Sequence, residues 1–325
     1  MNIQRRNFLR LGAGFIAASE LPRVALAKCA PLPPIKLRQI EICAGASKPF
    51  GAVHVSDTHI VRADSRDNAR KITLAARRSG HMKWGEHYLD EAIRAAESAG
   101  EMLIHTGDLI DFVSAANLEM AKRHFAGHDW FASSGNHEFS QYVGEAKEDD
   151  AYRRVSYNRV QAAYPNDITF ASRVVNGVNF VAIDDVYYNV TEAQHALFEK
   201  EVAKGLPIVI LCHVPFYTPR HHDEELKRSG GVCSYETGVP DEKIATWRAP
   251  SRPLGKGEEW RDRRVQQRAD APTKEFIKYI KAQPLLKAIL CGHCHKFWEE
   301  RFSPTAVQYV CSATYMGDGY RIRFT

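Results

Sequence analysis

Short apolar runs that end in polar clusters recur along the first half of the chain. The three runs and the polar residues that follow them are 50–55 with Asp57, 102–105 with Asp108, and 130–133 with Asn136. Segments 86–99 and 118–125 lie between them and carry apolar residues at helical spacing. This alternation predicts a βαβαβ unit. Its polar clusters fall at the carboxyl ends of the strands, where open α/β sheets bind ligands.

The second half repeats this pattern less regularly. A helix is predicted at 192–203, and the period-two runs predict further strands. These strands are expected at 168–175, 179–183, 207–212, 287–291, 297–302, 307–312 and 320–324. We expect the last three to complete a second sheet, which gives an α/β fold with two sheets.

Two stretches, 60–84 and 219–271, break the pattern beside the polar clusters. The first is strongly basic, with only Asp64 and Asp67 as acidic residues. The second is rich in proline and charged residues. Long insertions of this kind serve as lids or specificity elements in some enzymes and are solvated surface loops in others. The sequence leaves both interpretations open.

Five polar clusters at predicted strand ends carry the candidate chemistry. They are Asp57-Thr58-His59, Gly107-Asp108 with Asp111, Gly135-Asn136-His137-Glu138, His213, and Gly292-His293-Cys294-His295. Each cluster alone is weak support for a site, because short motifs and single histidines are common. Together they offer carboxylate, imidazole and amide ligands suited to zinc, iron or manganese. A bridging carboxylate can hold two such ions about 3.5–4 Å apart.

The order D-x-H, GDxxD, GNH[DE], a single His and GHxH resembles the signature of calcineurin-like metallophosphoesterases. The matching blocks span residues 57–295. The resemblance implies a four-layer α/β/β/α sandwich, in which helices flank two mixed β-sheets. It also implies hydrolysis of a small phosphomonoester or phosphodiester by a hydroxide that bridges two metal ions. The alternative is a non-catalytic binding scaffold of the same fold, but no ligand of the pattern is missing here.

The resemblance further implies a role for each site residue. It gives the first metal to Asp57, His59 and His295, the bridge to Asp108, and the second metal to Asn136, His213 and His293. His137 would act on the phosphoryl oxygen or the leaving group, and Asp111 would orient it. The metals would be manganese, iron or zinc, with their identity open. Purple acid phosphatases place a metal-binding tyrosine shortly after the bridging aspartate. This chain has Asp111 and Phe112 in that region, so a tyrosine-ligated ferric site is not expected.

The N-terminus resembles a twin-arginine export signal. Arg5 and Arg6 open the run RRNFLRLG, an apolar stretch follows at 11–18, and an A-x-A site ends at Ala27. We therefore expect residues 1–27 to be a signal peptide that engages the Tat export machinery and directs the protein to the periplasm or the medium. A linker is expected at 28–49 and a catalytic domain at 50–325. No later segment is apolar enough to predict a membrane anchor.

Charge and cysteine content narrow the function further. The net charge is +5, but the expected signal peptide contributes four arginines and one glutamate, or +3, which leaves +2 for the rest. That balance argues against a dedicated nucleic-acid binder. The seven cysteines cannot all pair within the chain. Cys291 and Cys294 form a C-x-x-C, which we interpret as packed thiols; the alternative is a thiol-dependent or zinc-thiolate enzyme.

Overall fold

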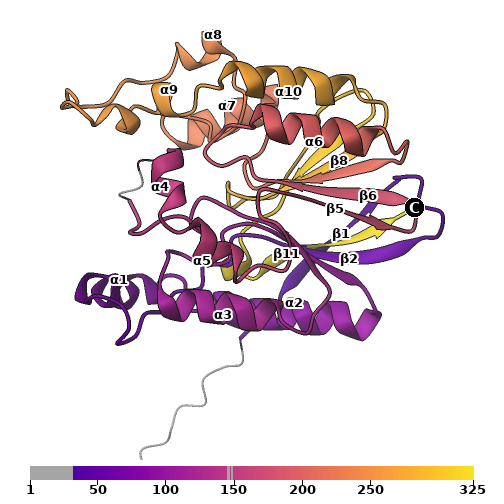
Figure 1. Cartoon of the computed structure of the whole chain (residues 1–325), viewed down its shortest axis with the longest axis horizontal. Coiled ribbons are helices and arrows are strands. Elements are labelled where there is room, and N and C mark those ends of the chain that lie inside the picture. The colour runs from indigo at the N-terminus through magenta and orange to yellow at the C-terminus, as the bar shows by residue number, and fades with distance from the viewer. Residues whose placement is uncertain (1–31, 145–146, 148) are drawn as a thin grey trace, which may run out of the picture. The chain divides into compact units, whose positions relative to one another are not determined.

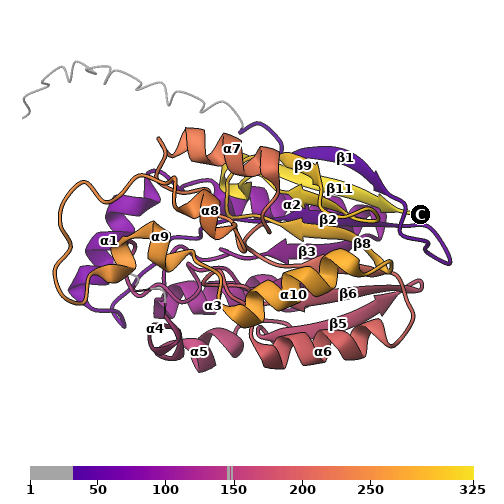
Figure 2. The same cartoon turned by 90° about the horizontal axis from the view of Figure 1, so that it is seen from above.

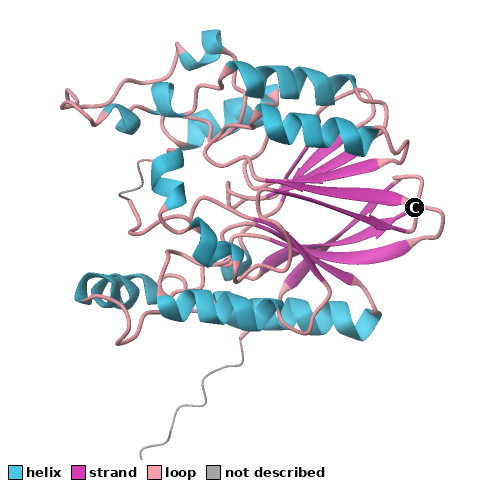
Figure 3. Cartoon of the chain, in the orientation of Figure 1, coloured by secondary structure: helices cyan, strands magenta, loops and turns pink. Residues whose placement is uncertain are grey.

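Two β-sheets pack face to face, and helices cover the outer face of each sheet (Figures 1 and 3). The structure is a computed structural model that describes residues 32–325, without 145, 146 and 148. Residues Pro34–Thr325 form one compact unit. The predicted four-layer α/β/β/α arrangement is confirmed. The predicted signal peptide, residues 1–27, lies outside the described residues.

The first sheet has the strand order β1-β11-β2-β3-β4. Its strands are β1 (Lys36–Ile42), β2 (Phe50–Val55), β3 (Met102–Thr106), β4 (Trp130–Ser133) and β11 (Asp318–Phe324). β2, β3 and β4 run parallel, whereas β11 is antiparallel to β2 and parallel to β1. The carboxyl ends of β2, β3 and β4 therefore lie at one edge.

The second sheet has the order β5-β6-β7-β8-β10-β9. Its strands are β5 (Phe170–Val175), β6 (Val178–Ile183), β7 (Ile208–Leu211), β8 (Leu286–Cys291), β9 (Trp298–Arg301) and β10 (Val307–Val310). β6, β7, β8 and β10 are parallel, and the two outer strands are antiparallel to their neighbours. The ends of β7 and β8 therefore also share an edge.

Four helices form the outer layers. α2 (Gly85–Ala99) and α3 (Ala115–Phe125) cover the first sheet, and α6 (Glu192–Val202) and α10 (Ala271–Ala282) cover the second (Figure 1; seen from above in Figure 2). Local sequence fixes their ends. Thr191 and Gln194 form a capping box at the start of α6, and Asp270 caps α10 through the backbone N–H of Thr273. α2 ends at Gly100, whose φ of 64° suits glycine.

An apolar layer between the two sheets holds them together. Phe180 of β6 lies against Phe324 of β11 and Phe50 of β2, with ring centroids 5.2 and 6.0 Å apart. Successive residues of β3 alternate between layers, since Ile104 faces the other sheet and Leu103 faces the helices. These strands are buried on both faces, which explains their continuous apolar runs.

The predicted strands and helices are present with shifted ends, but two expectations were wrong. The region 28–49 is not only a linker, because it contains β1. The sequence of β1 is largely polar and its side chains are mostly exposed, so its apolar pattern is weak. The last strand, β11, belongs to the first sheet and not to the second. Its alternating pattern marks one buried face, but such a pattern does not identify the neighbouring strands.

The two irregular stretches contain ordered helices. Residues 60–84 hold α1 (Ala69–Ser79). Residues 219–271 hold α7 (Pro219–Arg228), α8 (Asp241–Ile244), η1 (Glu259–Arg261) and α9 (Arg263–Gln266). The later stretch has a small apolar cluster of its own around Trp247. Further short helices are α4 (Asp150–Arg154), α5 (Tyr157–Gln161) and η2 (Thr314–Met316). Within the described residues, none of the helices combines the length and apolarity needed to cross a membrane.

The inter-sheet layer should dominate the stability of the fold. Phe180→Ala is expected to lower the free energy of unfolding by about 3–5 kcal/mol, because it leaves a cavity between the sheets. Val174→Ala on β5 is the control, since Val174 is 49% exposed. Urea denaturation followed by circular dichroism measures both. Equal effects of the two substitutions would show that the sheets do not depend on this layer.

Candidate metal centre

The five polar clusters converge where the strand ends of both sheets meet. Asp57 and His59 follow β2, and Asp108 follows β3. Asn136 and His137 follow β4. His213 follows β7, and the pair of histidines at 293 and 295 follows β8. Residues far apart in sequence thus form one site, as the sequence predicts for parallel strands with polar carboxyl ends.

Sharp backbone turns present these side chains. Asp57, Asp108 and His293 have φ values of 54°, 55° and 69°, in the left-handed region that residues with a Cβ rarely adopt. Gly292 lets the loop after β8 approach the loop after β2, because a Cβ on Gly292 would lie 1.8 Å from Ser56 Oγ. Backbone strain of this kind clusters at functional sites.

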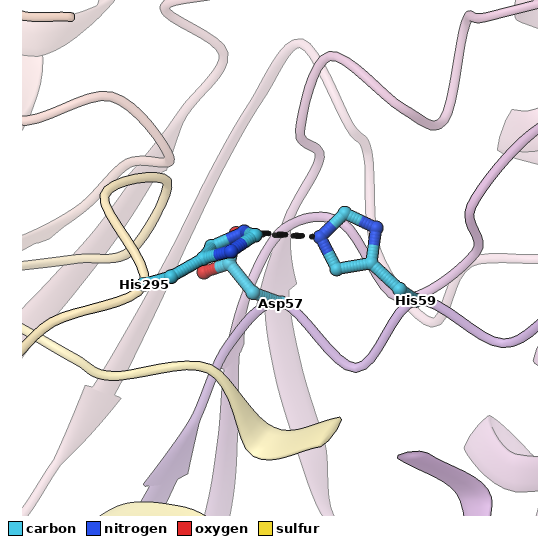
Figure 4. Close-up of side chains that lie close together, drawn as sticks. All are labelled: Asp57, His59 and His295. Carbon is cyan, nitrogen blue, oxygen red and sulfur yellow. Dashed lines mark hydrogen bonds and ion pairs between the residues drawn. The ribbon is translucent and has the colours of Figure 1, made fainter. Parts of the chain in front are cut away.

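The first group of ligand atoms belongs to Asp57, His59 and His295 (Figure 4). The Nε2 atoms of His59 and His295 lie 3.2 Å apart. Asp57 Oδ1 lies 3.1 Å from His295 Nε2 and 3.8 Å from His59 Nε2. His59 Nδ1 is 3.1 Å from Asp111 Oδ1, so its other nitrogen can offer a lone pair to this group. Four-coordinate zinc with bonds of about 2 Å separates its ligand atoms by similar distances.

The second group belongs to Asp108, His213 and His293. His213 Nδ1 donates to the Thr106 carbonyl at 2.7 Å, which leaves Nε2 facing the site. That Nε2 lies 3.3 Å from Asp108 Oδ2 and 3.1 Å from His293 Nδ1. Asp108 Oδ2 is also 3.7 Å from His59 Nε2 of the first group. One carboxylate oxygen therefore lies between the two groups.

Asn136 and His137 complete the site from the end of β4. The Oδ1 atom of Asn136 is buried and has no hydrogen-bond partner among the described residues. The His137 backbone N–H donates to Asp108 Oδ1 at 2.8 Å, and its ring stands edge-on to that of His59.

Asp111 contacts His137 differently from the expectation. His137 Nδ1 donates to the backbone carbonyl of Asp111 at 2.7 Å, while the carboxylate Oδ1 is 3.5 Å away. The carboxylate instead accepts from Arg78 through both oxygens, at 2.7 Å each, and lies beside His59 Nδ1. Asp111 thus orients His59 with its side chain and His137 with its backbone.

The structure adds Arg78 and two tyrosines, which the sequence did not mark as part of the site, and it shows what Glu138 of the third cluster contacts. Arg78 comes from α1 in the basic stretch, whose charge was the only signal. The Tyr188 hydroxyl lies 3.3 Å from His293 Nε2, and the Tyr315 hydroxyl 3.3 Å from His295 Nδ1. Glu138 accepts the backbone N–H of Asp108 at 2.8 Å, which supports that loop. No sequence pattern marks the two tyrosines.

The ionisable side chains of the site shift one another's pKa values strongly. Burial disfavours the charged form of Asp108, but His213, His137 and His59 together more than offset this and hold the pKa of Asp108 well below its usual value. Burial also disfavours a charged His213, yet Asp108 raises its pKa to about 10. Burial and the neighbouring His213 lower the pKa of His293 to about 3. Burial and the nearby Asp108 raise the pKa of Glu138 to about 7.

The sequence profile of the calcineurin-like phosphoesterase family matches residues 52–297. The chain belongs to this family. No curated protein matches it in sequence.

Three distantly similar solved structures carry phosphatase or hydrolase names. A dimetal phosphatase from Danio rerio is 12% identical with a TM-score of 0.47, covering 82% of this chain and 88% of that chain. A purple acid phosphatase from yellow lupin has the same identity, TM-score and coverage of this chain, but 44% of its own length is covered. The phosphopantetheinyl hydrolase of Mycobacterium tuberculosis is 14% identical with a TM-score of 0.32, and the match covers 81% of this chain and 89% of that chain. The family assignment rests on the profile alone.

As a calcineurin-like phosphoesterase, the protein is a metal-dependent phosphoric ester hydrolase, and the family implies a dinuclear metal centre. The residues present fit such a centre. Asn136 Oδ1 is buried without a hydrogen-bond partner among the described residues, and Asp57 Oδ1 is buried with only the imidazoles of His59 and His295 beside it, which is costly unless a cation satisfies both oxygens. Pairs of imidazole nitrogens that face each other at 3.1–3.2 Å give the same indication.

Metal uptake should depend steeply on pH. Because the pKa of His213 is raised to about 10, its imidazole holds a proton at neutral pH that a metal ion must displace. The apparent affinity for the ion that His213 would bind should therefore rise about tenfold per pH unit between about pH 6 and pH 9. The low pKa values of Asp57 and Asp108 keep both carboxylates ionised over this range. Competition with a chromophoric chelator measures the affinity, and a flat profile would contradict this account of His213.

Proposed function

We propose that this protein is an exported phosphoesterase that hydrolyses small phosphomonoesters or phosphodiesters at a dinuclear metal centre. One observation carries the proposal: Asp108 Oδ2, which belongs to the second group of ligand atoms and lies 3.3 Å from His213 Nε2, is also 3.7 Å from His59 Nε2 of the first group. A carboxylate in that position suits a bridging ligand. The proposed ligands are Asp57, His59 and His295 for one ion, Asn136, His213 and His293 for the other, and Asp108 for both.

Two bound ions would lower the pKa of a water molecule and neutralise charge on the phosphoryl group. The chain supplies the remaining groups. Arg78 fixes the Asp111 carboxylate, which in turn fixes the ring of His59. This chain of contacts holds a proposed ligand in one orientation. The identity of the ions is left among manganese, iron and zinc.

His137 is the proposed proton donor to the leaving group. Its backbone is tied to Asp108 and its Nδ1 to the Asp111 carbonyl, so Nε2 is the nitrogen that can act on substrate. Burial lowers the pKa of His137, but Asp108 and Asp111 more than compensate and raise it above its usual value. A proton held in this way suits a general acid. His137 also lines the cavity beside the site.

That cavity has a volume of about 460 Å³ and is closed partly by the stretch 219–271. Arg228, Tyr235, Trp260 and Arg263 of this stretch line it together with several of the proposed metal ligands. These residues favour a lid or specificity role for the stretch over a dispensable surface loop. We propose that its aromatic rings and guanidinium groups contact a leaving group that is planar or carries further negative charge.

The metal-reconstituted protein should hydrolyse an aryl phosphate ester. Comparing an aryl monoester with its bis-aryl diester would identify the preferred class of ester.

Asp108→Asn should lose metal and activity together. His137→Ala should keep both ions and lose about two to four orders of magnitude in kcat, the usual contribution of a positioned acid or base. Metal analysis and steady-state kinetics on the same samples decide. Full metal content with undiminished kcat in either variant would contradict its assigned role.

Export by the twin-arginine route is part of the proposal and rests on the sequence around Arg5 and Arg6. The double substitution Arg5→Lys with Arg6→Lys should leave a folded, active precursor in the cytoplasm of a bacterial host. Cell fractionation with activity assays measures this. The matched control is Arg23→Lys, which lies outside the twin-arginine motif. Periplasmic recovery of the double variant at the wild-type level would rule out this route.

A further inference from the structure

Three buried side chains with metal-binding atoms meet beside the dinuclear centre without belonging to it. His221 and Glu225 lie one helical turn apart on α7 and therefore share a face. Cys294 comes from the loop after β8. Their ligand atoms all lie within 4.8 Å of one another, and the residues are 1%, 0% and 1% exposed.

The surroundings of His221 resemble those of a metal-binding histidine. His221 Nδ1 lies 3.0 Å from Oε1 of Glu236, which is fully buried. Histidines that bind metals usually donate their other ring N–H to a carboxylate or carbonyl, which fixes the tautomer and the direction of the ligating nitrogen. The His221–Glu236 pair provides this arrangement, with Nε2 left for a ligand.

Glu225 has one oxygen satisfied and one not. Its Oε2 accepts from Arg228 Nε at 2.8 Å. Its Oε1 is buried and has no hydrogen-bond partner within the described part of the chain. Leaving a buried carboxylate oxygen without a partner is costly. A cation at the meeting point of the three side chains would remove this cost.

The donor atoms and charges select the type of cation. Nitrogen, oxygen and sulfur ligands together suit zinc, and thiolate ligands disfavour magnesium and calcium. Tetrahedral zinc separates such ligand atoms by about 3.3–3.8 Å, so small side-chain shifts of about 1 Å would close the site. The carboxylates of Glu225 and Glu236 and the Arg228 cation sum to −1. A divalent cation with a Cys294 thiolate adds +1 and makes the cluster neutral.

We propose that His221, Glu225 and Cys294 bind a third metal ion, a zinc or similarly thiophilic divalent cation, separate from the dinuclear centre. A water molecule would take the fourth position. This ion would fasten α7, and with it the stretch 219–271, to the loop that carries His293 and His295. Cys294, Arg228 and Tyr235 also line the 460 Å³ cavity, so the ion would hold the lid residues beside the substrate space.

The competing arrangement needs no metal. In it, His221 Nδ1 pairs with Glu236, Arg228 pairs with Glu225, and Cys294 is a packed thiol, as the C-x-x-C suggested from sequence. The two arrangements differ in the metal content of the folded protein and in whether the Cys294 sulfur touches a cation. Both quantities can be measured without an activity assay.

The test uses the full chain, stripped with a chelator and titrated with Zn²⁺ or Co²⁺ alone. Wild type should bind three equivalents, and the third equivalent of Co²⁺ should add thiolate-to-cobalt charge-transfer absorption in the near ultraviolet. Cys294→Ser should bind two equivalents and lack this absorption. Cys233→Ser is the matched control, because Cys233 is as fully buried as Cys294 and lies in the stretch 219–271, outside the cluster. It should keep all three equivalents and the absorption.

Cys294 lies between His293 and His295, so its substitution could also disturb the dinuclear centre. A second variant controls for this effect. Glu225→Gln acts from α7, away from the loop that holds His293 and His295, and should weaken the third equivalent at least about tenfold while two are retained. Two equivalents in wild type without charge-transfer absorption would overturn the proposal, and so would absorption that persists in Cys294→Ser. Loss of the dinuclear centre's activity alone would concern the proposed function and leave the third site standing.

Discussion

The packing of one sheet against the other is the constraint on which the site depends. An apolar layer that includes Phe180 and Phe324 holds the sheets together. Within each sheet, the strands that carry ligands run parallel, so their carboxyl ends lie together. Only because the sheets face each other do the loops after β2, β3 and β4 meet those after β7 and β8. The hydrophobic effect is non-directional, but by packing the two sheets together it also brings the polar residues of the centre together.

The centre itself is costly to form. It places the carboxylates of Asp57 and Asp108 in a buried site and holds both residues at positive φ. Burial of a charge is tolerated where opposite charges surround it, and the histidines provide part of that compensation. Within the centre, Asn136 Oδ1 has no hydrogen-bond partner in the described structure, and Asp57 Oδ1 has only imidazole nitrogens beside it. We infer that metal binding completes the compensation, so that stability and function depend on the same ions.

The two stretches that interrupt the α/β pattern both serve the site. From the basic stretch, Arg78 fixes Asp111 and through it His59. From residues 219–271, α7 brings His221 and Glu225 against Cys294, and the following segment lines the cavity. The family's motifs thus supply the proposed metal ligands, and the chain's own insertions shape what surrounds them. The proposed third ion would join these two parts.

The sequence by itself determined most strands and helices and the set of candidate ligands. Periodicity and polar strand ends are local properties, and the family motifs preserve the order of the ligands along the chain. Tertiary structure alone decided that Lys36–Ile42 is a strand, that β11 belongs to the first sheet, and that Asp111 reaches His137 through its carbonyl. It also decided the contacts of Arg78 and the cluster around Cys294. These depend on partners distant in sequence, and an alternating pattern specifies which face is buried but not against what.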